Sequence, residues 1–158
     1  MAQEYTIDQT DEKILNLIKR DARLSFREIG KQLNLSTGTV SDRIKGMQAH
    51  GVIKGFVTAI DPELMGFKVT MLMCLRVAPG HSRESVEAAL ESVSEACCLH
   101  AVTGDVDIVL LVRATDQKHA AHVIDRIRTI EGVERVDSHV VLRSCTVCGE
   151  CGCDCGWG

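Results

Sequence analysis

The spacing of apolar residues changes its period along this chain, and that change constrains the fold more than any other feature. In residues 8–50 apolar side chains recur every three or four positions, which is typical of short amphipathic helices. From about residue 67 onward, runs of strand-like composition alternate with helical stretches. A chain of 158 residues with 45% hydrophobic and 25% charged residues has room for two small domains of these kinds. The pattern therefore predicts an α+β protein with a helical front module and a mixed back module.

Three short helices are predicted in the front module, each with its own N-terminal cap. Asp8 is placed to cap the first helix, with Asp11 three residues later. Ser25 and Glu28 form a capping box at the start of the second helix. We expect the apolar residues of this helix, Phe26, Ile29 and Leu33, to be buried. A tight turn then leads to the third helix, with Ser36 as its cap.

The third predicted helix has one apolar face and one small, polar, partly cationic face. Val40, Ile44 and Met47 recur at helical spacing and should pack on the neighbouring helices. Such a helix fits a DNA major groove, where Ser, Thr and Arg contact phosphates and base edges, and the arrangement predicts a helix-turn-helix. A small bundle with a solvated third helix is the alternative that spacing alone leaves open. The predicted DNA contacts are Ser36, Thr37, Thr39, Ser41, Arg43, Lys45 and Lys54.

The back module is predicted to contain four strands and two helices in the order βαββαβ. This order favours a four-stranded antiparallel sheet with both helices on one face. A further extended run, residues 52–60, is expected to form a strand that tethers the two modules. The predicted sheet strands are residues 67–77, 97–103, 107–113 and 133–142, and the helices follow caps at Ser82 and Asp116.

The strands of the back module are apolar on both faces. Leu72 and Cys74 alternate with core residues on one strand, and Val109 and Leu111 do so on another. An antiparallel sheet with one wetted face should be polar on that face. Because burying a large aliphatic side chain is worth about 1.5–3 kcal/mol, we expect the second face to meet another subunit. A symmetric dimer would also match two recognition helices to two half-sites.

Charge is divided unevenly along the chain. Residues 1–60 hold 9 Lys/Arg and 7 Asp/Glu, a net of +2, whereas residues 61–158 hold 9 and 15, a net of −6. A mildly basic front and an acidic back indicate different partners. No run approaches the ~18 apolar residues of a membrane helix, and no signal-peptide pattern opens the chain, so we expect a cytoplasmic protein without a membrane partner.

Seven short motifs occur in a fixed order, at residues 8–15, 21–23, 28–30, 33–36, 40–44, 51–56 and 61–66. In this combination the chain resembles the Lrp/AsnC (feast/famine) transcription regulators up to about Arg143; Gly38, a poor helix former, departs from the pattern. The resemblance implies DNA binding, pairing through a ferredoxin-like (ACT-like) module and assembly of dimers into octamers. The predicted domains are a helix-turn-helix at 1–51, a hinge strand and linker at 52–66, the ferredoxin-like module at 67–143 and a cysteine-rich tail at 144–158.

The resemblance also implies an effector site at a turn in the back module. Thr103, Gly104, Asp105 and Asp107 look like the family's Gly-x-x-Asp turn, which lines an amino-acid pocket between subunits. Gly104 would leave backbone N–H groups open to a carboxylate, and an Asp can accept from an α-ammonium group. An ordinary hairpin turn is the alternative, since Gly-Asp is common turn chemistry.

Eight cysteines are distributed unevenly, with five in the last 14 residues. Thiolates at such short spacings, interleaved with glycine, can enclose Zn(II), Cu(I) or an iron–sulfur cluster. Reversible disulfides and an unstructured tail are the alternatives. Cys97 and Cys98, adjacent on a predicted strand, are expected to be core residues on opposite faces. The candidate metal ligands are Cys145, Cys148, Cys151, Cys153 and Cys155.

Two other functions are compatible with this arrangement of modules. Some sirohaem decarboxylases share both modules, but here His100 stands without a partner base and the only Trp is Trp157, so we expect no enzyme. A low-specificity DNA-packing protein is the second alternative, and the net charge of −4 argues against it.

Overall fold

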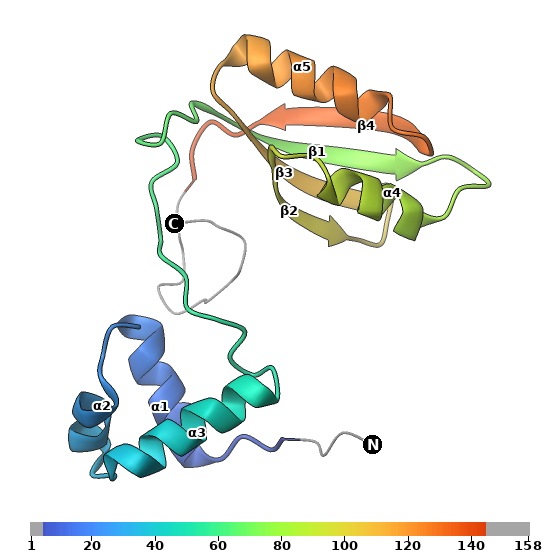
Figure 1. Cartoon of the computed structure of the whole chain (residues 1–158). Helices are drawn as coiled ribbons and strands as arrows, with labels where there is room; N and C mark the ends of the chain where they lie inside the picture. The colour runs from blue at the N-terminus through green and yellow to red at the C-terminus, as the bar shows by residue number, and fades with distance from the viewer. Residues whose placement is uncertain (1–4, 145–158) are drawn as a thin grey trace. The chain divides into compact units, whose positions relative to one another are not determined.

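The computed structural model describes residues 5–144, which fall into two compact units that divide after Thr58. The first unit contains three helices: α1 (Gln9–Arg20), α2 (Phe26–Leu33) and α3 (Thr37–Ala49) (Figure 1). The expected caps are confirmed, since Asp8 and Ser25 each complete a capping box and the Ser36 side chain accepts from the Thr39 amide. Local cap chemistry therefore sets where each helix begins.

The helical unit has its own hydrophobic core. Ile14 of α1, Ile29 of α2 and three residues of α3 meet there with essentially no exposed surface. The expectation for Phe26 was wrong, because this side chain is 38% exposed and Leu33 is half-buried. Phe26 is the first residue of α2, so it lies at the margin of the core. The α3 residues of this core are Val40, Ile44 and Met47.

The turn between α2 and α3 is tight because two backbone segments approach closely. Asn34 adopts a left-handed conformation (φ 55°), and the Leu35 amide donates to the Gly30 carbonyl at 2.8 Å. A Cβ on Gly30 would lie 2.7 Å from the Leu35 carbonyl oxygen, closer than real contacts allow. Glycine at position 30 is therefore what permits α3 to follow α2 at this distance.

The strand expected at residues 52–60 is absent from the described chain. The amides of Val52 and Ile53 both donate to the Met47 carbonyl, and Ile53 is buried in the helical core. Residues 54–60 are exposed and form no strand. A strand requires a neighbour to pair with, and the four described strands pair only with one another.

The second unit confirms the βαββαβ order. Its sheet is antiparallel throughout, with strand order β2-β3-β1-β4. Figure 1 shows α5 running along β4 and α4 over β2. None of the described helices is long and apolar enough to cross a membrane. The elements are β1 (Val69–Val77), α4 (Arg83–Glu91), β2 (Ala96–Ala101), β3 (Ile108–Ala114), α5 (Gln117–Arg128) and β4 (Val133–Val140).

The two sheet faces differ in burial. Met73 and Leu110, on the helix-covered face, have no exposed surface. On the opposite face Leu111 is buried, whereas the apolar residues beside it are half-buried. We call this set the second face; its apolar members are Leu72, Cys74, Cys98, Val109 and Leu111.

Cys97 and Cys98 are not core residues, which corrects the sequence expectation. A register shift between Ala96 and Cys98 bulges β2. Cys97 is exposed, and Cys98 is half-buried and paired with Leu111 on the second face.

An ionic cluster fixes α5 to the start of β2. Glu95 accepts from His119 Nε2 at 3.0 Å and from Arg126 Nη1 at 3.1 Å. Chiefly through the His119 hydrogen bond, the pKa of Glu95 falls to about 2, so this carboxylate stays ionised at neutral pH. The cluster therefore fixes the start of β2 against α5.

Candidate nucleic-acid and effector sites

The N-terminal half of α3 presents short polar side chains to solvent. Ser36 Oγ accepts from the Thr39 amide at 3.0 Å and lies 2.8 Å from Thr39 Oγ1. Thr37 and Lys45 are exposed, and Ser41 is half-buried at the edge of the core. The structure therefore brings these five predicted contacts to one helix, while Lys54 lies exposed in the segment that follows.

Arg43 has a structural role that the sequence did not reveal. Its Nη1 donates to Asp8 Oδ2 and, at 3.1 Å, to Asp11 Oδ1 at the start of α1. Asp11 is only 1% exposed, and it also accepts from the hydroxyl of Tyr5 at 3.1 Å. The Arg43 hydrogen bond lowers the pKa of Asp8 below its usual value. Arg43 thus ties α3 to α1, and its assignment as a DNA contact stays a prediction.

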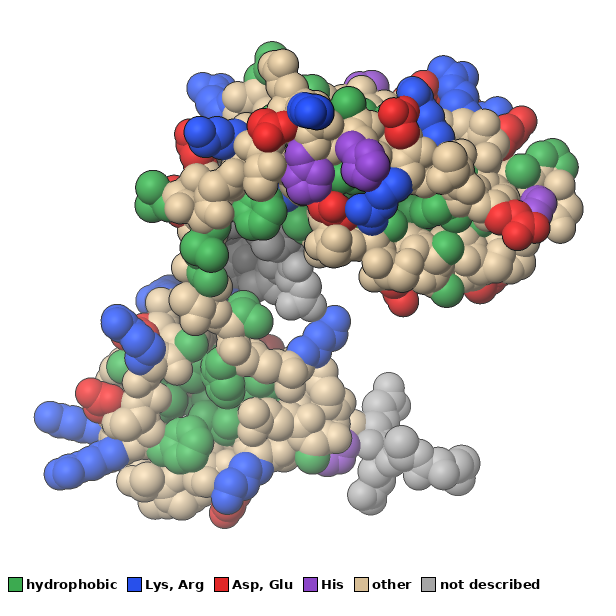
Figure 2. Space-filling model, turned by 45° about the horizontal axis from the view of Figure 1, so that its top comes forward, with side chains coloured by type: hydrophobic (Ala, Val, Ile, Leu, Met, Phe, Trp, Pro, Cys, Tyr) green, Lys and Arg blue, Asp and Glu red, His purple; other side chains and the backbone are tan. Residues whose placement is uncertain are grey.

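Charge on the helical unit suits an anionic partner. On the side shown in Figure 2, Lys and Arg side chains stand out around the margin of this unit, and Asp or Glu side chains lie beside some of them. An exposed helix of short polar residues, in a unit with projecting Lys and Arg side chains, can approach the phosphates of duplex DNA.

The predicted effector residues form the turn between β2 and β3. Gly104 has φ 120°, a conformation that favours glycine, and Thr103, Gly104 and Asp105 are exposed. Arg76 Nε donates to the Asp105 carbonyl at 3.1 Å, and Asp107 Oδ2 accepts from the Val77 amide at 2.8 Å. Asp107 therefore holds the turn against β1, and the exposed part of the turn is what a ligand can reach.

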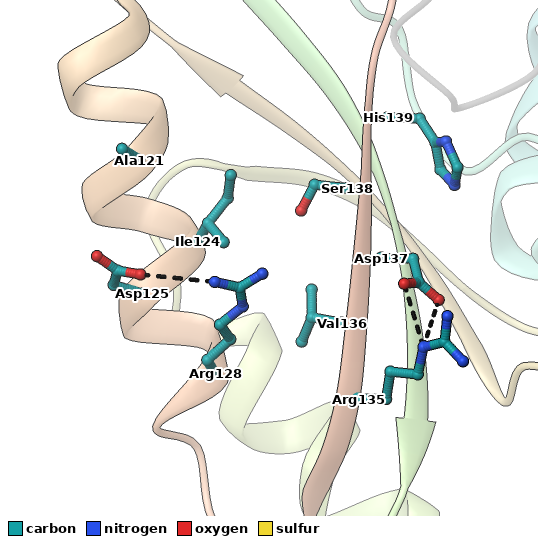
Figure 3. A pocket seen from close by; sticks show the side chains of 9 residues that line it. All are labelled: Ala121, Ile124, Asp125, Arg128, Arg135, Val136, Asp137, Ser138 and His139. Carbon is teal, nitrogen blue, oxygen red and sulfur yellow. Dashed lines mark hydrogen bonds and ion pairs between the residues drawn. The ribbon is translucent and has the colours of Figure 1, made fainter.

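A groove of about 630 Å³ lies elsewhere, between α5 and β4. Figure 3 shows Ile124, Arg128 and Ser138 facing one another on the helix side of β4, with Arg135 and Asp137 on the other side. Arg135 Nε lies 2.9 Å from Asp137 Oδ2, so part of the charge around this groove is already paired. None of the residues predicted for DNA or effector binding lines it.

The metal ligands predicted in the tail fall outside the described residues. Among residues 5–144, no group of three or more His, Cys, Asp and Glu side chains is arranged to hold a metal ion. The cysteines concerned are Cys145, Cys148, Cys151, Cys153 and Cys155.

Two family models cover most of the chain. Residues 7–54 match a winged helix-turn-helix DNA-binding model, and residues 70–146 match the Lrp/AsnC ligand-binding domain. Their boundaries follow the two structural units.

Individual relatives agree with these matches. An HTH-type transcriptional regulator of Mycobacterium tuberculosis is 37% identical over 140 residues, spanning 86% of this chain and 92% of the relative. The E. coli AsnC structure is 28% identical and covers 89% of this chain and 95% of its own, with a TM-score of 0.82. A Neisseria meningitidis transcriptional regulator solved with L-Met is 25% identical and covers 89% and 93%, with a TM-score of 0.83. With its helix-turn-helix joined to a four-stranded effector-type domain, the chain belongs to the Lrp/AsnC family of DNA-binding transcription regulators.

Proposed function

We propose that this regulator binds operator DNA as a homodimer, through the exposed face of α3, and that a small effector modulates the binding. The observation that carries the proposal is the polar, sterically small N-terminal half of α3, held by the Ser36 cap above a fully buried Val40. Side chains of this size let a helix enter a major groove closely enough to reach base edges.

A charge reversal at Lys45 tests the DNA-binding face. On a DNA fragment selected by the wild-type protein from a random library, we expect Lys45→Glu to weaken binding by about tenfold or more. The slope of log affinity against log salt should fall by about 1, because one phosphate contact is lost. Fluorescence anisotropy at several salt concentrations measures both quantities.

Lys118→Glu, on α5, is the matched control, since it changes net charge equally in the other unit. An equal loss of DNA affinity in Lys45→Glu and Lys118→Glu would mean that overall charge, and not the α3 face, determines DNA binding. The selected fragments also test a DNA-packing role, which would show no sequence preference and a steep salt dependence in the wild-type protein.

The effector we propose is an amino acid bound at the β2–β3 turn. Support comes from the exposed Gly104 backbone, which can donate to a carboxylate, beside the side chain of Asp105, which can accept from an ammonium group. Structural neighbours from Neisseria meningitidis and M. tuberculosis were solved with L-methionine, which makes it the first ligand to titrate.

Asp105→Asn separates this turn from the α5–β4 groove. If the turn binds the α-ammonium group, Asp105→Asn should weaken binding of L-methionine, or of whichever amino acid in a panel binds, by about tenfold, because a charge-assisted hydrogen bond is lost. Asp125→Asn, in the α5–β4 groove, should leave the affinity for the amino acid unchanged. Calorimetric titration of the full chain measures both; a loss confined to Asp125→Asn would move the site to the groove.

The dimer we propose forms through the second face. Its apolar centre at Leu72, Val109 and Leu111 gives a partner sheet a surface to bury. Assembly of dimers into octamers stays a prediction, and sedimentation velocity of the full chain distinguishes the two sizes. An enzymatic role is not supported, because the matching domains and relatives are transcription regulators.

A further inference from the structure

The hydroxyl of Ser138 is a buried polar group that the described part of the chain does not satisfy. Its Oγ has almost no exposed surface and finds no hydrogen-bond partner among the described residues. Ser138 lies on β4 and, like Val136 two positions earlier, points towards α5 (Figure 3). Leaving a buried hydroxyl unpaired is unfavourable, because the group has given up its hydrogen bonds to water. An acceptor that enters the α5–β4 groove, which Ser138 lines, would satisfy this hydroxyl.

The two walls of the groove place polar and apolar side chains at matching intervals. On α5, Ile124 and Arg128 are four residues apart, about 6 Å along the helix axis, and therefore lie on one face. On β4, Val136 and Ser138 are two residues apart, about 6.6 Å along the strand. Figure 3 shows Ser138 beside Ile124 and Val136 beside Arg128. Each end of the groove therefore combines one apolar and one polar side chain.

The charged group that projects into the groove is a cation. Figure 3 shows the Arg128 guanidinium pointing from α5 towards β4, and this side chain is 57% exposed. Its Nη1 lies 3.9 Å from Asp125 Oδ1, which is too long for a hydrogen bond, so the guanidinium keeps its donors. The Asp125 carboxylate lies on the side of this guanidinium away from β4, and Asp137 projects to the other side of β4. The groove therefore favours an anion and offers no inward carboxylate to an ammonium group.

The rest of the groove suits a small aliphatic molecule. Val136 is only 7% exposed, and the half-buried Ile124 packs against the core of this unit, so both present fixed apolar surface. A volume of about 630 Å³ lies within the range of small-molecule sites. Sites of this kind combine apolar walls with a few polar groups that orient the ligand.

We propose that the α5–β4 groove binds a small aliphatic carboxylate that carries a second, uncharged acceptor oxygen, such as a ketone, near its other end. Arg128 binds the carboxylate, and the Ser138 hydroxyl donates to the ketone oxygen. A chain of about four or five bonds spans the roughly 6 Å between the two ends of the groove, where Ile124 and Val136 contact it. The ligand differs in class from the amino acid proposed for the β2–β3 turn, because it has no ammonium group.

The test uses 5-oxohexanoate as the probe, since four carbon–carbon bonds separate its ketone and its carboxylate. Hexanoate lacks the ketone, and 2-hexanone lacks the carboxylate. In an NMR titration of the isotopically labelled full chain, 5-oxohexanoate should shift the amides of residues 121–128 and 135–139 in a saturable manner. It should bind more tightly than either analogue. A titration in which these amides do not shift would overturn the proposal.

Variants on the two walls test the assigned contacts. Ser138→Ala should weaken binding of 5-oxohexanoate about fivefold and leave binding of hexanoate unchanged, because hexanoate has no oxygen for this hydroxyl. Its melting temperature should stay the same or rise, since an unpaired buried hydroxyl is removed. Arg128→Gln should weaken binding of both carboxylates about tenfold. An equal loss of both ligands in Ser138→Ala would contradict the assigned hydrogen bond.

Lys118→Gln is the matched control for charge, because it removes one cation from α5 outside the groove. It should leave the affinity for 5-oxohexanoate unchanged. Losses of equal size in Lys118→Gln and Arg128→Gln would show that the anion is attracted by overall charge, and would overturn the site.

A separate pair of measurements distinguishes this site from the proposed effector site. Asp105→Asn, in the β2–β3 turn, should leave binding of 5-oxohexanoate unchanged, and L-methionine should not displace the probe. Displacement by L-methionine would identify the groove as the amino-acid site and overturn a second ligand class. If no amino acid binds the chain, the proposed effector fails, whereas the titration with 5-oxohexanoate still tests the groove.

Discussion

Replacing Gly30 with Ala should destabilise the helical unit by about 2–3 kcal/mol, because the new methyl group overpacks a contact between two backbone segments. Its Cβ would lie 2.7 Å from the Leu35 carbonyl oxygen, and backbone cannot move aside as a flexible side chain can. The α2–α3 turn must open, which also shifts the α3 face. We therefore expect faster hydrogen exchange at amides of residues 9–49 and a parallel loss of DNA affinity.

Gly38→Ala is the control that the chain itself provides. A Cβ at Gly38 would meet only Ser36 Oγ, at an ordinary 3.7 Å, and Gly38 lies within α3. Because Ala is a better helix former by up to about 1 kcal/mol, this variant should be as stable as the wild type or more stable. Equal stability of Gly30→Ala and Gly38→Ala would contradict the tight turn described here.

Arg43→Ala should cost the helical unit about 2–4 kcal/mol, since it leaves the buried carboxylate of Asp11 without its cationic partner. Arg43→Lys should recover only part of this loss, because a single ammonium group reproduces the guanidinium geometry poorly. Chemical denaturation of the full chain, with hydrogen exchange to localise the change to residues 9–49, measures the effect.

Arg23→Ala controls for the loss of an arginine in the same unit. Arg23 pairs with Asp21 at 3.2 Å, but its side chain is 91% exposed, so its removal should leave the stability of the unit nearly unchanged. If Arg43→Ala instead leaves stability unchanged and weakens only DNA binding, Arg43 is a DNA contact, as the sequence suggested, and the tie to α1 contributes little.

Local chemistry explains what could be predicted from the sequence. The helix starts depend on a cap residue and the amides two or three positions later, so Asp8, Ser25, Ser36, Ser82 and Asp116 were all identified correctly. The βαββαβ order of the elements followed from strand-like runs that alternate with helical stretches. These features require knowledge of only a few neighbouring residues.

Features that depend on distant partners were missed. Arg43 meets Asp8, 35 positions away, and nothing in the helix pattern distinguishes it from an exposed arginine. Residues 52–60 have strand-like composition, yet no described strand pairs with them. The exposure of Cys97 was also missed, because a bulge shifts the register of β2 against β3, and bulges leave no clear mark in a single sequence.

The two outer strands of the sheet are poor templates for adding further chains. β4 carries three charged residues, Glu134, Arg135 and Asp137, along an outer edge of the sheet. Charged side chains at an edge oppose the addition of further strands. β2 is only six residues long and is interrupted by its bulge, which disturbs the ladder that an incoming strand would need. Such edges discourage runaway polymerisation, while they leave available the closed, face-to-face pairing that we propose for the second face.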